Sequence, residues 1–69
     1  MSSSLIERDI MVLLADGKVH SAHEIGSYAG LSRERTIDWC DRLCREGKLE
    51  KGTKEIFGIY RVTAYRRLV

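Results

Sequence analysis

The chain has 69 residues, of which 43% are hydrophobic and 32% charged, and it contains no proline. This composition is typical of one small globular domain, 1–69, and excludes disordered or proline-rich recognition segments. The formal net charge of +2 does not by itself identify a nucleic-acid-binding protein, but the positive excess lies in the C-terminal part, from Lys48 onward.

No apolar run approaches the length that crosses a bilayer. The N-terminal residues also lack the basic segment followed by an apolar one that marks a signal peptide. We therefore expect a cytoplasmic protein without a membrane partner. In that compartment the two cysteines are expected to be free thiols.

The first part of the chain predicts two helices. Ser4 and Glu7 have the spacing of a capping box, and Gly17 supplies a stop, so we expect helix 1 at about 5–16. Its apolar stripe consists of Ile6, Ile10, Leu13 and Leu14. The same spacing recurs at Ser21 and Glu24, and Gly30 follows, so we expect helix 2 at about 22–29.

The most strongly marked element is a third helix, at about 33–46. Ser32 is a good N-cap, and Gly47 is suited to the left-handed conformation that ends many helices. One face carries an apolar stripe of Thr36, Cys40, Leu43 and Cys44. The opposite face carries the charged residues Glu34, Arg35, Asp38, Asp41, Arg42 and Arg45.

A β-hairpin is predicted at about 48–62. Residues 57–62 are rich in β-branched and aromatic types, and Gly52 to Glu55 read as the turn. In this register Tyr60 and Val62 lie on the inner face. The tail, 63–69, has no clear period and could be an extra strand or a short helix. Its Tyr65-Arg66-Arg67 could follow a phosphate backbone or be a soluble end.

The order of elements resembles the winged helix-turn-helix fold, an α+β architecture of three helices and a C-terminal β-hairpin wing. The residues that carry the resemblance are SAHEIGSYAGLS, then Thr36, Cys40, Leu43 and Gly47, then Leu49 and Tyr60-Arg61-Val62. In size and layout the chain is similar to the very small bacterial regulators of fimbrial operons. Two features depart from the pattern. Cys40 replaces a large aliphatic residue, and the exposed face of helix 3 carries the acidic residues Glu34, Asp38 and Asp41.

The resemblance implies a transcriptional regulator that binds double-stranded DNA sequence-specifically. Helix 3 would enter the major groove, where arginine can donate two hydrogen bonds to guanine. Wing lysines flanking the hairpin turn would contact phosphates. The candidate DNA-binding residues are Ser32, Arg33, Arg35, Asp38, Arg42, Lys51 and Lys54. The competing interpretation of these charges is a solvated face with local pairs such as Asp38–Arg42 and Asp41–Arg45.

Two other function classes stay open. The acidic residues of helix 3 also fit a protein-interaction module, or self-association, and Trp39 could anchor a partner instead of packing on the domain. Cys40, Cys44, His20 and His23 could make a thiol- or metal-dependent sensor, although they lack zinc-finger spacing and a buried cysteine usually packs as a small hydrophobe. No catalytic motif is present, so we expect no enzyme, cofactor or metal.

Overall fold

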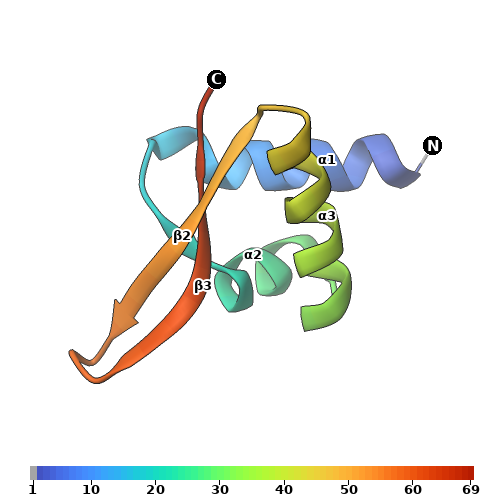
Figure 1. Cartoon of the computed structure of the whole chain (residues 1–69). Coiled ribbons are helices and arrows are strands. Elements are labelled where there is room, and N and C mark those ends of the chain that lie inside the picture. Colours follow the sequence, from blue (N-terminus) through green and yellow to red (C-terminus); the bar gives the residue numbers. More distant parts are fainter. Residues whose placement is uncertain (1) are drawn as a thin grey trace.

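The computed structural model describes residues 2–69, and side chains from Leu5 onward. The chain forms a three-helix domain with a three-stranded antiparallel sheet in the order β1-β3-β2 over these residues (Figure 1). The elements are α1 (Ser2–Leu13), a short 3₁₀ turn η1 (Leu14–Asp16), β1 (His20–Ser21), α2 (Ala22–Ala29), α3 (Arg33–Arg45), β2 (Leu49–Ile56) and β3 (Tyr60–Arg67). This is the α+β winged helix that the order of elements predicted.

Helix α1 begins earlier than the sequence suggested. It starts at Ser2, so Ser4 lies within the helix, and its prediction as N-cap is wrong. A serine in the first turn is tolerated by a helix, so the capping-box spacing alone did not locate the start. The predicted stop is confirmed, because Gly17 takes the left-handed conformation at φ 75° and donates to the carbonyl of Leu14.

Helix α2 begins as predicted, with a complete capping box. The Ser21 hydroxyl accepts from the backbone N–H of Glu24 at 3.1 Å, and the Glu24 carboxylate accepts from the backbone N–H of Ser21 at 3.0 Å. Two otherwise free donors are thereby satisfied. Since Ser21 also belongs to β1, which pairs with β3, the same residue ties the start of α2 to the sheet.

Helix α3 packs closely against α2 in the helix-turn-helix. A Cβ atom added to Gly26 would lie 2.7 Å from Thr36 Oγ1 and 3.0 Å from the Leu31 carbonyl oxygen, so only glycine fits here. The predicted inner stripe is confirmed at Thr36, Cys40 and Leu43, which are fully buried. Burial of this face decides which side of α3 points outward.

The hairpin turn lies further along the chain than predicted. Gly52 to Glu55 continue β2, and the reversal occurs at Phe57 and Gly58, whose φ angles are 58° and 69°. The backbone N–H of Ile59 donates to the Ile56 carbonyl at 3.1 Å, which closes a type I′ turn centred on Phe57 and Gly58, and Ile59 completes the loop because Ile56 pairs with Tyr60. Such a turn matches the twist of the flanking strands and so lets both strands extend to it.

The inner face of the second strand is also different from the prediction. Tyr60 is exposed and Val62 is only half-buried, so the assignment of Tyr60 to the core is wrong. Ala64 and Tyr65 are buried instead, because β3 continues to Arg67 and is the central strand of the sheet. The open alternatives for 63–69 are resolved in favour of a strand.

Tyr65 is the largest fully buried side chain of the domain. Its hydroxyl donates to Asp41 Oδ1 on α3 at 2.9 Å, which joins the sheet to the helix across the core. The buried cluster around it contains Ile10, Leu14, Ala22, Ile25, Cys40, Leu43 and Leu49, with Trp39 and Cys44 packed at its edge. Trp39 therefore packs on the domain, although its ring is not fully covered.

The wing is fastened to α2 by an ion pair. Lys54 Nζ on β2 lies 2.7 Å from Glu24 Oε1. The hydrogen bond from Lys54, followed by that from the Ser21 backbone, lowers the pKa of Glu24 from 4.5 to about 2. Glu24 thus caps α2 and holds the wing at the same time.

We expect Gly26→Ala to destabilise the domain by about 1–3 kcal/mol, because the added methyl group overlaps Thr36 and backbone that cannot move aside cheaply. Urea unfolding measures the change. Gly52→Ala is the matched control, since nothing lies within 4 Å of its added Cβ and we expect a change within about 0.5 kcal/mol. Equal effects of the two substitutions would refute the close approach of α2 and α3.

The Glu24 pair predicts a pH dependence of stability. The pKa of Glu24 is depressed in the folded state. Its contribution to the free energy of unfolding is therefore complete above about pH 4.5 and is lost as the pH falls toward about 2. We expect the free energy of unfolding to fall less steeply over this window in Glu24→Gln than in the parent. Urea unfolding at a series of pH values tests this. The other acids are common to both proteins, so parallel curves would contradict the prediction.

Candidate nucleic-acid interface

The N-terminal half of α3 presents its polar face to solvent. Ser32 is the N-cap, as predicted, and its hydroxyl accepts from the Arg35 backbone N–H at 3.3 Å. The Thr36 hydroxyl donates to the Ser32 carbonyl at 2.8 Å and so fixes the first turn from the buried side. The side chains of Arg33 and Arg35 are consequently exposed.

These two arginines, like Arg45 at the far end of α3, are cations of the helix that the fold leaves available. Among the described side chains, Arg33 and Arg35 take part in no ion pair. Arg42, by contrast, lies 3.5 Å from Glu46 and stacks over the Trp39 ring, 5.4 Å from its centroid. Two of the three arginines of α3 without an ion pair among the described side chains therefore lie in its first turn, and the third, Arg45, lies in its last.

The acidic residues predicted on the outer face of α3 do not all lie there. Asp41 is half-buried, accepts from Tyr65 and lies 3.2 Å from Lys51 Nζ. The local pairs Asp38–Arg42 and Asp41–Arg45 do not form among the described residues; Asp41 is engaged with the sheet instead. Only Glu34 and Asp38 remain as exposed acids of the helix.

Lys51 and Lys54 are not at the tip of the hairpin. Both lie within β2, and each is paired across the domain, Lys51 with Asp41 and Lys54 with Glu24. The prediction that they flank the turn is wrong, because the turn forms at 57–58 and not at 52–55. The exposed cation nearest the tip is Arg61 on β3, opposite Glu55 in the register.

The C-terminal cations are used within the fold. Arg66 pairs with Glu50 on the neighbouring strand, and Arg67 donates to the Met11 carbonyl at 2.9 Å and to the Val69 carbonyl. The alternative of a soluble end is wrong, since Tyr65 is a core residue and the two arginines fasten the ends of the sheet, whereas contact with a phosphate backbone stays a prediction.

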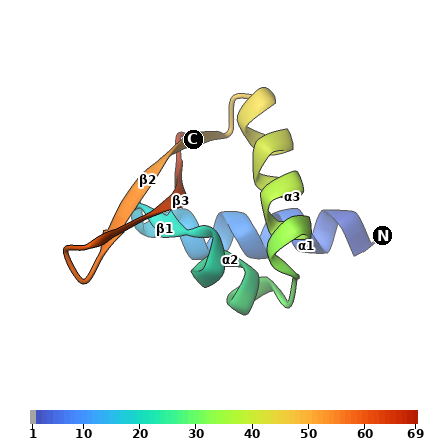
Figure 2. The ribbon, with the colours of Figure 1, turned by 60° about the horizontal axis from the view of Figure 1, so that its bottom comes forward.

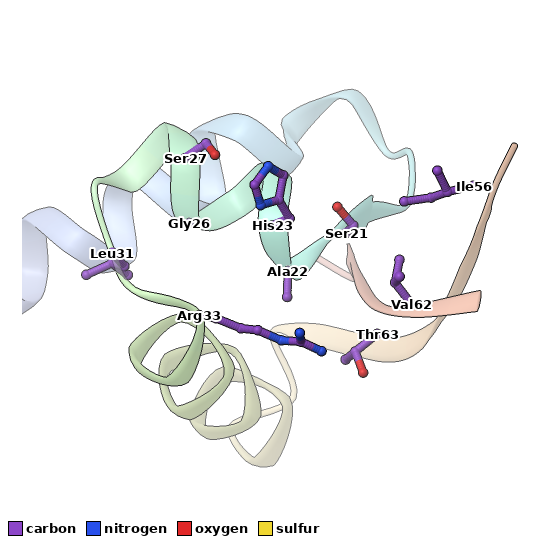
Figure 3. A pocket seen from close by; sticks show the side chains of 10 residues that line it. All are labelled: Ser21, Ala22, His23, Gly26, Ser27, Leu31, Arg33, Ile56, Val62 and Thr63. Atoms are coloured by element: carbon purple, nitrogen blue, oxygen red, sulfur yellow. The ribbon is translucent and has the colours of Figure 1, made fainter. Parts of the chain in front are cut away.

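A pocket of about 270 Å³ lies between the starts of α2 and α3 and the wing (Figure 3). Arg33 extends across it from α3 toward Thr63 of β3. The residues that line it are Ser21, Ala22, His23, Gly26, Ser27, Leu31, Arg33, Ile56, Val62 and Thr63. The pocket thus brings polar groups of α2 and β3 beside Arg33 of α3.

Sequence reasoning missed His23, Ser27 and Thr63 as members of this surface. His23 and Ser27 are four residues apart on α2 and so share one face, which was a usable signal. Thr63 could not have been found, because the predicted strand ended at Val62. Of the predicted residues, the structure brings only Arg33 into the pocket, with Ser32 and Arg35 adjacent to it in the chain.

The thiols and histidines do not converge on one site. Cys40 is fully buried, and burial raises its pKa to about 12, whereas Cys44 is half-buried. His20 Nε2 lies 2.9 Å from Asp16 Oδ2, while His23 is in the pocket. No group of three or more potential metal ligands occurs among residues that the structure describes. Within the same residues no helix has both the length and the apolar character of a membrane span.

Comparison with known proteins adds information about the fold. No protein-family model matches the chain, and no curated protein matches it. Among solved structures, Stf76 from the Sulfolobus islandicus plasmid-virus pSSVx superposes with a TM-score of 0.76 at 16% identity, over 90% of this chain and 79% of that one. A possible transcriptional regulator from Methanosarcina mazei Go1 gives a TM-score of 0.68 at 11% identity, over 87% of this chain.

The present chain spans about half, 52%, of the length of the Methanosarcina protein. At these identities the likeness concerns the fold alone, and it agrees with the winged helix built above from capping, burial and strand register. The finer resemblance to bacterial regulators of fimbrial operons stays a prediction.

Proposed function

We propose that this protein is a transcriptional regulator that binds double-stranded DNA, with α3 in the major groove. The observation that carries the proposal is the position of Arg33 and Arg35, which are exposed and free of ion pairs on the first turn of α3. In a recognition helix this turn meets base edges, and arginine donates two hydrogen bonds to guanine O6 and N7. One solved structure of the same fold is described as a possible transcriptional regulator.

The pocket beside Arg33 supplies the phosphate contacts in this proposal. His23, Ser27 and Thr63 offer a ring nitrogen and two hydroxyls along one path from α2 to the wing. Contacts of this kind position a protein on the backbone without reading sequence. Arg61 takes the place that we had predicted for Lys51 and Lys54, since those lysines are paired with carboxylates of α3 and α2.

The two competing functions have less support. The protein-interaction module was inferred from three acids on helix 3, of which Asp41 serves the core contact with Tyr65. The thiol sensor requires a reactive thiolate, and a Cys40 pKa of about 12 keeps that thiol protonated near neutral pH. DNA binding requires neither a cofactor nor a catalytic residue.

The first test is the salt dependence of DNA binding. We expect the logarithm of the affinity for mixed-sequence duplex to fall linearly with the logarithm of salt concentration, with a slope of about 0.9 per neutralised phosphate. Fluorescence anisotropy of a labelled duplex at several salt concentrations measures it. Absence of binding at low salt would remove the proposed function.

A second test separates base contacts from phosphate contacts, on a duplex selected from a random pool and on its scrambled version. Arg33→Ala and Arg35→Ala should each weaken binding to the selected site by about 1–3 kcal/mol and affect the scrambled duplex less. Arg61→Ala should weaken both alike and lower the salt slope by about one unit.

Arg8→Ala is the matched control for this set, because Arg8 is an exposed arginine on α1, which contributes no residue to the pocket. It should leave both affinities unchanged. A large loss on the selected site with Arg61→Ala and none with the α3 variants would reverse the assigned roles of helix and wing.

A further inference from the structure

The tip of the wing is apolar and almost fully exposed. Phe57 is 88% exposed, Ile59 75% and Tyr60 63%. In a small domain that needs its large side chains for the core, three adjacent exposed ones contribute little to folding. Such a patch on a projecting element marks a contact surface.

The turn itself is built to present the Phe57 ring. The first central position of a type I′ turn requires a positive φ, which asparagine, aspartate and glycine adopt readily and a bulky residue does not. Phe57 nevertheless takes φ 58° there. Phe57 keeps this unfavourable backbone conformation although its exposed ring gains little stabilisation from packing. This indicates that the side chain serves a function.

The tip belongs to the same surface as the candidate DNA interface. The hairpin projects well beyond the helices and ends at the tip (Figures 1 and 2). Ile56, which directly precedes the turn, and Val62 on the opposite strand line the pocket that Arg33 crosses. A duplex that contacts α3 and the pocket therefore continues toward the tip.

We propose that the wing tip enters the minor groove of this duplex and that Phe57 inserts between base pairs as a wedge, with Ile59 and Tyr60 against the groove walls. The inference rests on the proposed function. Apolar wedges of this kind unstack one base step and kink the duplex. They favour pyrimidine–purine steps such as TA, which unstack most easily.

A second copy of the chain fits the tip less well. Each aromatic side chain can bury about 150–250 Å², so two of them and one isoleucine fall short of the roughly 800 Å² per partner of a stable interface. A wedge needs no such area, because phosphate contacts elsewhere hold the duplex. The partner that suits the size of the patch is thus DNA.

The test uses two duplexes of equal length that contain only A·T pairs. One alternates T and A, so that every second step is TA, and the other has all adenines on one strand and has no TA step. Both present the same minor-groove acceptors. One adenine of each duplex is replaced by 2-aminopurine, whose fluorescence rises when it unstacks.

We expect the parent protein to bind the alternating duplex about tenfold more tightly than the homopolymeric one, the loss typical of removing one aromatic–base stack. The 2-aminopurine signal should rise on the alternating duplex. Phe57→Asn should abolish the preference and the signal while leaving the salt slope unchanged, since no phosphate contact is removed. This variant creates an Asn-Gly turn, which favours the hairpin, so a loss does not stem from misfolding.

Leu5→Gln is the matched control, because Leu5 is an exposed apolar residue on α1, away from the wing, and it should behave as the parent. Salt-dependent binding by the parent without preference or unstacking would overturn the wedge and leave the proposed function standing. Absence of parental binding to either duplex would overturn both. A dimer seen by sedimentation for the parent and lost in Phe57→Asn would assign the tip to self-association and also overturn the wedge.

Discussion

The contact between Tyr65 and Asp41 fixes the geometry on which the surface of this domain depends. Tyr65 lies on the central strand, fills the largest share of the core, and places its hydroxyl 2.9 Å from a carboxylate on α3. Because a buried hydroxyl without a partner would be costly, the rotation of α3 about its axis is tied to the sheet. That rotation turns Asp41 inward and leaves Arg33 and Arg35 outside. The electrostatic character of the outer face follows from a packing constraint.

The fold also divides the positive charges into those that are paired within the domain and those that are free to contact a ligand. Lys51, Lys54 and Arg66 pair with carboxylates on other elements or strands, and Arg67 closes the end of the sheet. A count of basic residues along the chain therefore overstates the number that can meet phosphate. What remains exposed is Arg33 in the pocket, Arg35 next to it in the chain and Arg61 on the wing, and these are the cations that the proposed function uses in a chain with a formal net charge of only +2.

The wing combines a firm base with an exposed end. At its base the Lys54–Glu24 pair and the capping box of α2 share one carboxylate, so the hairpin and the helix-turn-helix are held in a fixed relation. At its end the type I′ turn projects Phe57 away from every other element. In the proposed wedge, a hairpin that is already held at its base loses less conformational freedom on binding than a loose one would.

Local chemistry in the sequence determined the helices and their order. The capping residues Ser21 and Ser32, the stop glycines and the stripe of Thr36, Cys40 and Leu43 act within one or two turns, so they can be read without knowing the fold. The exposed arginines at the start of α3 follow from the same stripe. The order of elements was enough to predict the winged helix and, through it, DNA as the proposed partner.

The tertiary structure alone decided the wing and the use of the charges. The turn at 57–58 depends on pairing with a central strand that reaches Arg67, and no local pattern distinguished it from Gly52–Glu55. The roles of Asp41, Lys51 and Lys54 depend on neighbours 10 to 30 residues away in the chain. Pairing partners and burial are set by which elements meet in space, and a one-dimensional pattern holds no information on that.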